Sequence, residues 1–281
     1  MELVFYAGSS LLEGPIWDSN NKVVYCVSIE QGIIYQVNPS TGEVQTYLTD
    51  GSVGCVALTP EGNLMSAEKN GIFITDPKTR EKTYLTQFES NADLRYNDGR
   101  FDPIGRFIVG TKSEIDYFTE PQFKIEKGNL FSYYKGEYKI ILTDLLISNG
   151  IGFSLDSKKM YFIDTPTKKV AQYQYDLSTG GILFEKDIIK IDGIGWPDGM
   201  CVDLDGNVWV AEWGGGRIRK WDVNTGKNID EISLPCPLVT SCCLGGKNLD
   251  EIFITTAKNN KNDTLGGSLF KTKLTKQIII K

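Results

Sequence analysis

A two-residue motif recurs six times along the chain at intervals of 40 to 51 residues, and five copies end in glycine. Four copies carry a carboxylate or an amide side chain directly before the glycine. The six copies are Glu13-Gly14, Val53-Gly54, Asp98-Gly99, Asn149-Gly150, Asp198-Gly199 and Thr240-Ser241. Repeats of this length are typical of β-propellers and other repeat arrays. In a propeller the equivalent positions of all blades surround one axis, so these side chains are expected to converge there.

The segments between the motifs are predicted to be short strands. Residues 23–29 and 33–37 are rich in β-branched and aromatic residues, and turn-forming residues bound both segments. The same order returns at residues 159–163 and 170–175. Each unit therefore contains a motif followed by about four strands. Six such units predict an all-β fold, a six-bladed β-propeller with four-stranded blades, and we expect residues 1–281 to form a single domain of this kind.

Two segments fall outside the regular repeat. Residues 2–7 are largely apolar and precede the first motif, so we expect them to form the outer strand of the last blade. That pairing would close the ring and remove a free sheet edge. The third unit carries an insertion, residues 112–128, with charges of both signs. It is expected to form a loop over one face of the propeller.

Charge and composition exclude several classes of partner. The net charge is −6 with both signs interspersed, and no block of Lys or Arg stands out, which argues against nucleic acid. No apolar run is long enough to cross a bilayer, so no membrane partner is expected. The first six residues lack the basic and apolar regions of a secretory signal. We therefore expect a cytoplasmic protein.

The absence of histidine limits the possible chemistry. It excludes Ser-His-Asp and Cys-His catalysis and zinc bound by histidine. The six cysteines form no C-x-x-C pair and are expected to be small, buried and reduced. Catalysis would then depend on carboxylates, lysine, tyrosine or a metal ion held by oxygen ligands.

The motifs together predict such a metal site in the central channel. Each motif taken alone is an ordinary turn dipeptide. Their shared position, just before the strand expected to line the channel, places several carboxylates and amides close together. Buried carboxylates that face one another repel, and a cation on the axis would offset that cost. Oxygen ligands of this kind suit Ca²⁺, Mg²⁺ or Mn²⁺.

Five stretches of the chain carry a resemblance to a known family. They are Leu12–Asp18, Arg95–Arg106, Ile147–Gly150, Pro197–Met200 and Val239–Gly246. The stretches are distributed over almost the whole chain, and in them the sequence resembles the SMP-30/gluconolactonase family. The resemblance implies a six-bladed propeller with one divalent cation (Ca²⁺, Mg²⁺, Mn²⁺ or Zn²⁺) at one end of its channel. It also implies hydrolysis of a small-molecule lactone or ester, most simply a sugar lactone.

The resemblance also assigns roles to single residues. Glu13, Asn149 and Asp198 match the metal ligands of the family, and Asp198 also matches its catalytic base. Arg95 and Asn97 match the pair that contacts the substrate. The repeat spacing favours Asp98 as the ligand of the third unit, whereas the resemblance favours Asn97. We follow the resemblance, and expect Asp98 to point into a turn or to lie behind the ligands.

Several alternatives stay open at this stage. Arg95 would have a structural role if it formed an ion pair with Asp93 or Asp98. Lys112 stands where the family often has Met, and Glu114 lies one position out of register with a substrate-binding glutamate of some members. Two alternative functions also stay open. One is a calcium-binding regulatory or scaffold propeller without turnover, and the other is a metal-dependent esterase that acts on a non-sugar ester. Trp196 and Trp213 are candidates for the rim of the pocket.

Overall fold

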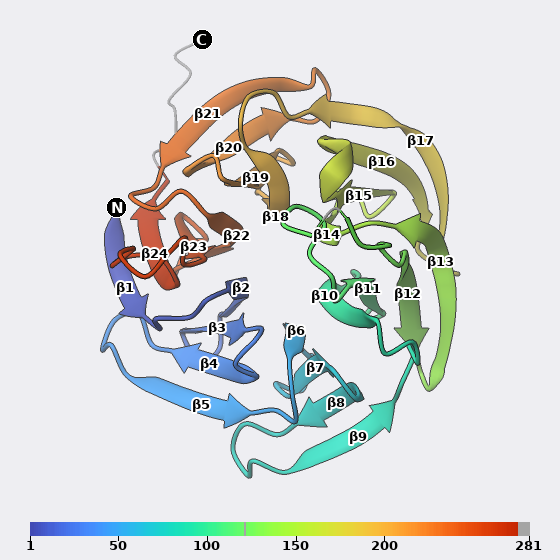
Figure 1. Cartoon of the computed structure of the whole chain (residues 1–281), viewed down its shortest axis with the longest axis horizontal. Coiled ribbons are helices and arrows are strands. Elements are labelled where there is room, and N and C mark those ends of the chain that lie inside the picture. The colour runs from blue at the N-terminus through green and yellow to red at the C-terminus, as the bar shows by residue number, and fades with distance from the viewer. Residues whose placement is uncertain (121, 275–281) are drawn as a thin grey trace.

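Six antiparallel sheets of four strands surround a central channel (Figure 1). The computed structural model describes residues 1–120 and 122–274. This arrangement confirms the predicted all-β, six-bladed propeller with four-stranded blades. In five blades the strand nearest the channel comes first in the chain, and the fourth strand lies at the periphery.

The first three blades are formed by residues 12–145. From the channel outward, the first blade consists of β2 (Leu12–Asp18), β3 (Val23–Ser28), β4 (Ile33–Val37) and β5 (Val44–Leu48). The second consists of β6 (Val53–Leu58), β7 (Leu64–Glu68), β8 (Gly71–Thr75) and β9 (Lys82–Thr86). The third consists of β10 (Leu94–Phe101), β11 (Phe107–Ser113), β12 (Gly128–Tyr134) and β13 (Glu137–Leu145).

The other three blades use residues 148–273 and the N-terminal strand. The fourth blade consists of β14 (Ser148–Phe153), β15 (Lys159–Asp164), β16 (Lys169–Asp176) and β17 (Gly181–Lys190). The fifth consists of β18 (Trp196–Val202), β19 (Val208–Trp213), β20 (Arg217–Asp222) and β21 (Lys227–Ser233). The sixth consists of β22 (Val239–Gly245), β23 (Glu251–Thr256), β24 (Ser268–Lys273) and β1 (Glu2–Tyr6). A short 3₁₀ helix, η1 (Thr165–Thr167), lies between β15 and β16. No helix among the described residues is long and apolar enough to cross a membrane.

The ring closes through β1, as predicted. β1 pairs antiparallel with β24, with Leu3 opposite Phe270 (Figure 1). The backbone N–H of Ala7 also donates to the carbonyl of Gly267 at 3.2 Å. The N-terminus thereby completes the last blade, and the edge of β24 is covered by a strand from the other end of the chain.

The hydrophobic core lies between the blades. Six clusters of buried apolar side chains occupy the six interfaces, and each cluster draws residues from two neighbouring blades. Inner blade strands are therefore buried on both faces, as in β3, where every residue is buried. This explains the continuous apolar run of residues 23–27, since a strand with one solvated face would alternate. The six cysteines are free and buried, and all but Cys236 belong to these clusters.

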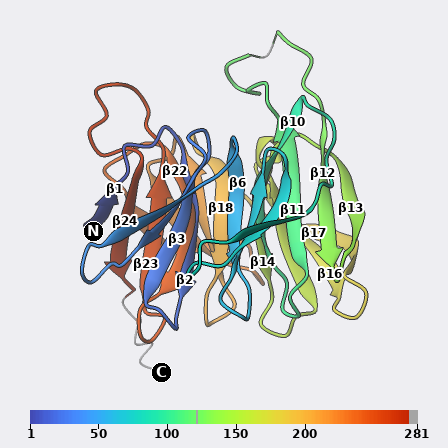
Figure 2. The ribbon, with the colours of Figure 1, turned by 90° about the horizontal axis from the view of Figure 1, so that it is seen from below.

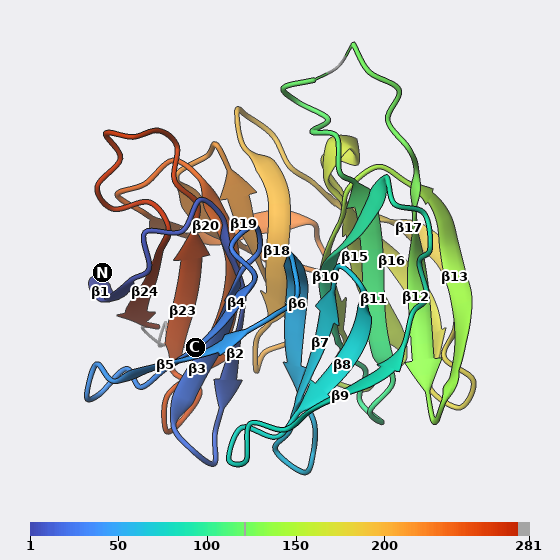
Figure 3. The same cartoon turned by 60° about the horizontal axis from the view of Figure 1, so that its bottom comes forward.

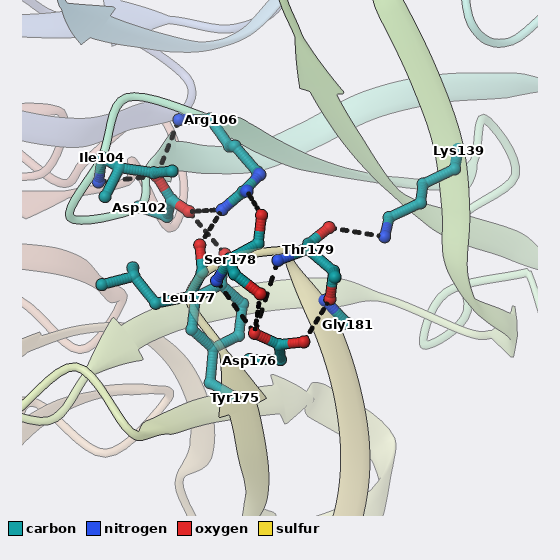
Figure 4. A network of polar contacts seen from close by, with 10 residues as sticks. All are labelled: Asp102, Ile104, Arg106, Lys139, Tyr175, Asp176, Leu177, Ser178, Thr179 and Gly181. Atoms are coloured by element: carbon teal, nitrogen blue, oxygen red, sulfur yellow. Dashed lines mark hydrogen bonds and ion pairs between the residues drawn. The ribbon is translucent and has the colours of Figure 1, made fainter.

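A polar network also joins the third and fourth blades (Figure 4). Arg106 donates through Nη1 to Asp102 Oδ2 at 3.0 Å and to the Leu177 carbonyl at 2.7 Å. Its Nη2 donates to the Ser178 carbonyl at 2.5 Å, and the Tyr175 hydroxyl donates to Asp102 Oδ2 at 2.5 Å. Asp102 and Arg106 are buried, so the loss of either would leave the other without its oppositely charged partner away from water.

The recurrent motifs lie inside the innermost strands, which corrects the prediction that they precede those strands. The pairing between the first and second strand of every blade shifts register at the motif. These shifts fall between Glu13 and Ile16, Val53 and Cys55, Tyr96 and Gly99, Asn149 and Ile151, Pro197 and Met200, and Val239 and Ser241. Each is a β-bulge, and a bulge re-aims the side chains beside it. The six bulges thus form one ring around the channel.

Glycine at the bulges allows the innermost strands to approach closely. A Cβ atom on Gly199 would lie 2.1 Å from Ser241 Oγ, and one on Gly54 would lie 2.4 Å from the Tyr96 carbonyl oxygen. Any larger residue would separate two neighbouring blades. At Gly54 and Gly199 the glycine is therefore required by contact between blades, whereas at Gly14, where a Cβ would meet nothing within 4 Å, a φ of +53° favours it. Neither reason requires the carboxylate or amide that precedes the glycine.

The insertion in the third blade forms a loop that rises from one face of the propeller (Figures 2 and 3). β11 continues to Ser113 and β12 begins at Gly128, so the loop is shorter than predicted and its ends belong to strands. Leu94 pairs with Ser113, which places the loop at the same face as the start of β10.

Candidate functional site at one end of the channel

Four innermost strands bring the predicted site residues together. Glu13 lies on β2, Arg95 and Asn97 on β10, Asn149 on β14 and Asp198 on β18. The side chains of Glu13, Asn97, Asn149 and Asp198 are buried, although each is polar. Buried polar groups require partners, so their contacts indicate what the site is built to hold.

The carboxyl groups of Glu13 and Asp198 lie close enough to influence each other's ionisation. Burial raises the pKa of both groups, and the charge of the other carboxylate contributes for Asp198. Glu13 accepts a hydrogen bond from the backbone N–H of Gly14 at 2.8 Å. In residues 1–120 and 122–274, no ion pair joins either carboxylate to a lysine or arginine.

Asn97 and Asn149 are linked side chain to side chain. Asn97 donates from Nδ2 to Asn149 Oδ1 and to the Ser148 carbonyl, both at 2.8 Å. Asn149 donates from Nδ2 to Thr165 Oγ1 at 2.8 Å, and that hydroxyl donates to the Pro197 carbonyl at 2.8 Å. This chain of hydrogen bonds fixes both amide orientations and ties the Asn149 side chain to the residue before Asp198.

Arg95 is held beside the asparagines. Its Nη1 donates to Asn97 Oδ1 at 2.7 Å and to the Tyr96 carbonyl at 2.9 Å. Its Nε lies 4.0 Å from a carboxylate oxygen of Glu114. Burial lowers the pKa of the guanidinium. The partners considered from sequence, Asp93 and Asp98, form no ion pair with Arg95 in the described part of the chain.

Asp98 lies in the bulge of β10. Of the two expectations for this residue, a turn or a place behind the ligands, the turn is wrong. Asp98 Oδ1 accepts the backbone N–H of Gly99 at 2.7 Å. Its negative charge adds to burial in raising the pKa of Glu13 and contributes likewise at Asp198. Asp98 therefore acts on the carboxylate pair through its charge.

The structure adds Lys112 to the site. Lys112 lies on β11 directly opposite Arg95 on β10, and only 9% of it is exposed. Burial, reinforced by the charge of Arg95, lowers the pKa of its ammonium group to about 8. Sequence comparison had singled out this position for its departure from the family. Its place in the site depends on the pairing of β10 with β11, which sequence did not provide.

Two aromatic residues meet at the mouth of the channel. Phe118, in the loop of the third blade, lies 4.8 Å from Trp196 of the fifth blade between ring centroids. Lys168 Nζ lies 4.2 Å from the centroid of the Trp196 ring. The inserted loop therefore contacts a distant blade at the face that carries Arg95, and Trp196 is part of the rim.

The donor set fits a hard divalent cation. No group of three or more His, Cys, Asp and Glu side chains suited to a metal occurs within residues 1–120 and 122–274. The site instead offers two carboxylates, Glu13 and Asp198, and the amide oxygen of Asn149. Two buried carboxylates close to each other repel when both are ionised, and a divalent cation would offset that repulsion. Oxygen donors of this kind are those that Ca²⁺, Mg²⁺ and Mn²⁺ prefer.

Comparisons with known proteins agree with this architecture. The family model described as SMP-30/Gluconolactonase/LRE-like region matches residues 11–258. A regucalcin from Xenopus laevis is 34% identical over 248 residues, covering 87% of this chain and 82% of the relative.

Two solved structures share the fold over nearly the full length. A luciferin-regenerating enzyme superposes with a TM-score of 0.86 at 27% identity, covering 96% of this chain and 95% of that chain. A calcium-binding protein, regucalcin, from Agrobacterium tumefaciens superposes with a TM-score of 0.88 at 24% identity, covering 97% and 93%. The predicted resemblance is confirmed, and the chain belongs to the SMP-30/gluconolactonase/LRE-like family.

Proposed function

We propose that this protein is a divalent-metal-dependent lactonase that hydrolyses a small cyclic ester, most simply a sugar lactone. The observation that carries the proposal is the burial of the Glu13 and Asp198 carboxyl groups close to each other, with the Asn149 side chain tied through Thr165 to the residue before Asp198. Membership in a family that includes gluconolactonases supports the reaction class. Fold alone would not, because propellers host many unrelated functions.

Glu13, Asn149 and Asp198 would hold the cation. When bound, the cation would polarise the ester carbonyl and stabilise negative charge on its oxygen. It would also favour the ionised form of both carboxylates, whose pKa values are raised without it. The reaction is then ordinary ester hydrolysis, in which water adds to the carbonyl carbon and the ring C–O bond breaks.

The residues of the chain divide the remaining work. Asp198, as a carboxylate, would accept the proton of the attacking water and return it to the leaving ring oxygen. Arg95 presents a planar set of N–H donors to the substrate, and its bond to Asn97 Oδ1 holds the guanidinium in place. The Asn97 amide is itself fixed by Ser148 and Asn149. Substrate hydroxyls would therefore meet donors that are already oriented.

The test is hydrolysis of a lactone panel after chelation and after return of single metals. We expect turnover of aldonolactones to disappear on chelation and to return with Ca²⁺, Mg²⁺, Mn²⁺ or Zn²⁺. A metal-loaded, folded protein with no rate above background on lactones and simple esters would contradict the proposal. That outcome would favour the alternative of a calcium-binding propeller without turnover.

A further inference from the structure

We propose that Lys112 and Arg95 form a two-cation subsite that binds an anionic group of the substrate, a carboxylate or a phosphate. The inference rests on the proposed lactonase function and names its substrate class, which is an acidic lactone. It is carried by the placement of two cationic side chains, the buried Lys112 and the partly buried Arg95, on one face of the third blade, at the end of the channel that holds the carboxylate pair.

The two cations are neighbours by strand register. Arg95 on β10 and Lys112 on β11 are paired directly, so their side chains leave the sheet on the same face. Like charges in directly opposed positions destabilise a sheet. An apolar residue at position 112 would avoid that cost, so the fold has no need of a lysine here. A bound anion between the two cations would turn the repulsion into attraction.

Lys112 is buried and has no partner for its charge in the described part of the chain. Only 9% of the residue is exposed, and Nζ forms no ion pair or hydrogen bond with residues 1–120 or 122–274. Nζ itself retains access to solvent, since it is not among the fully buried polar atoms without a partner in the described residues. The stem of the lysine is buried, however, and a charge in such surroundings is normally paired. The unpaired cation therefore indicates that a ligand supplies the negative charge.

The nearby acidic residues are engaged elsewhere. Asp116 Oδ1 accepts the backbone N–H groups of Phe118 and Thr119, both at 2.8 Å. Glu114 pairs with Lys69 at 3.6 Å and approaches Arg95 at 4.0 Å. Their charges favour the protonated form of Lys112, but neither side chain forms an ion pair with it.

Lys112 also lies near the end of the channel that carries Glu13 and Asp198. Arg95, directly opposite Lys112, donates to Asn97 Oδ1 at 2.7 Å, and Asn97 donates to Asn149 Oδ1 at 2.8 Å, which places both cations beside a proposed metal ligand. No ion pair joins Lys112 to Asp198 among the described residues, so Lys112 Nζ lies more than 4.0 Å from the Asp198 carboxylate oxygens. A lactone whose ester lies at Glu13 and Asp198 would direct a substituent acid group toward Lys112 and Arg95.

Kinetics on matched pairs of lactones tests the proposal. One pair is D-glucaro-1,4-lactone and D-glucono-1,4-lactone, which differ by a carboxylate. The other is 6-phospho-D-glucono-1,5-lactone and D-glucono-1,5-lactone, which differ by a phosphate. We expect the metal-loaded wild type to prefer the acidic member of one pair, and the pair that shows the preference identifies the anion. Lys112→Met should lower the ratio of kcat/KM values, acidic over neutral, on the order of tenfold to a hundredfold.

Two further variants give the control. Lys112→Arg retains the charge and should retain most of the preference, whereas a lysine acting as a neutral base would lose its function on this change. Lys69→Met removes an exposed cation of the second blade that pairs with Glu114, and it should leave the ratio within error of wild type. An equal loss in Lys69→Met would mean long-range attraction only and would overturn the subsite.

The outcomes separate this proposal from the lactonase proposal. If the neutral lactones are hydrolysed but neither acidic lactone is preferred, the subsite is wrong and the lactonase function stands. If no lactone is hydrolysed, calorimetric titration with D-glucarate and 6-phospho-D-gluconate tests the subsite directly. Wild type should then bind one of them about tenfold or more tighter than Lys112→Met. Equal affinities would overturn the subsite.

Discussion

The Asn97 side chain donates a hydrogen bond from Nδ2 to Oδ1 of Asn149 at 2.8 Å. On its other side Asn149 donates from Nδ2 to Thr165 Oγ1, so its amide oxygen faces Asn97 and the site. One residue proposed to contact substrate thereby orients one residue proposed to bind metal. The two roles are physically coupled, and the experiments below are designed to separate them.

Asp198→Ala is expected to abolish tight binding of a divalent cation, because it removes an anionic ligand together with its charge. Asp98→Ala provides the matched control, since it removes a nearby carboxylate that acts only through its charge. Calorimetric titration of the chelated protein measures both. The Asp98 variant should keep one site per chain with weaker binding. Unchanged stoichiometry and affinity in Asp198→Ala would refute the ligand assignment.

The metal-free protein should lose stability as the pH rises from about 5 into the neutral range. Burial raises the folded-state pKa of Glu13 and Asp198 above that of the unfolded chain. The contribution of such groups is fully present below the unfolded pKa, about 4, and is lost as the pH passes through the raised folded pKa. A divalent cation should reverse the loss by binding the ionised pair.

Thermal unfolding of chelated protein across this pH range measures the effect. The double variant Glu13→Gln, Asp198→Asn lacks both titrating groups and should show a flatter dependence of Tm on pH. Identical slopes for the wild type and the double variant would show that this pair does not titrate as described.

Replacing Arg95 by Ala should lower kcat/KM on the order of tenfold to a hundredfold, the cost of losing one charge-assisted hydrogen bond to the substrate. Metal affinity should change little, since Arg95 contacts neither proposed carboxylate ligand directly. Steady-state kinetics with metal in excess measures the first effect and calorimetry the second. Lys186→Ala, an exposed change on β17, is the control for net charge. A wild-type kcat/KM in folded, metal-loaded Arg95→Ala would remove Arg95 from the pocket.

Arg106→Ala should destabilise the propeller by roughly 3–5 kcal/mol, because it leaves the buried Asp102 carboxylate without its cation. Two carbonyls of the fourth blade, at Leu177 and Ser178, also lose their donor. Equilibrium unfolding in urea measures the change. Lys139→Ala removes an exposed donor to Thr179 in the same region and should cost no more than about 0.5 kcal/mol. A wild-type midpoint for Arg106→Ala would show that the network in Figure 4 contributes little.

The sequence by itself determined the architecture. The spacing of the motifs indicated six units, and the apolar strand segments indicated four strands in each. Residues 2–7 are apolar and precede the first motif, which predicted that the N-terminal strand closes the ring, and β1 confirms this. These features could be predicted because they depend on local composition and on regular spacing, and a propeller repeats one unit around an axis.

Only the tertiary structure decided which way the side chains of the site point. The motifs proved to be bulges inside the innermost strands, and a shift of one residue in a strand reverses the face of every side chain beyond it. Asp98 could therefore not be placed from spacing. Lys112 joined the site because it pairs with Arg95 across β10 and β11, and Phe118 because its loop contacts Trp196 of another blade. Such contacts depend on register and on packing between blades, which the order of residues along one strand does not contain.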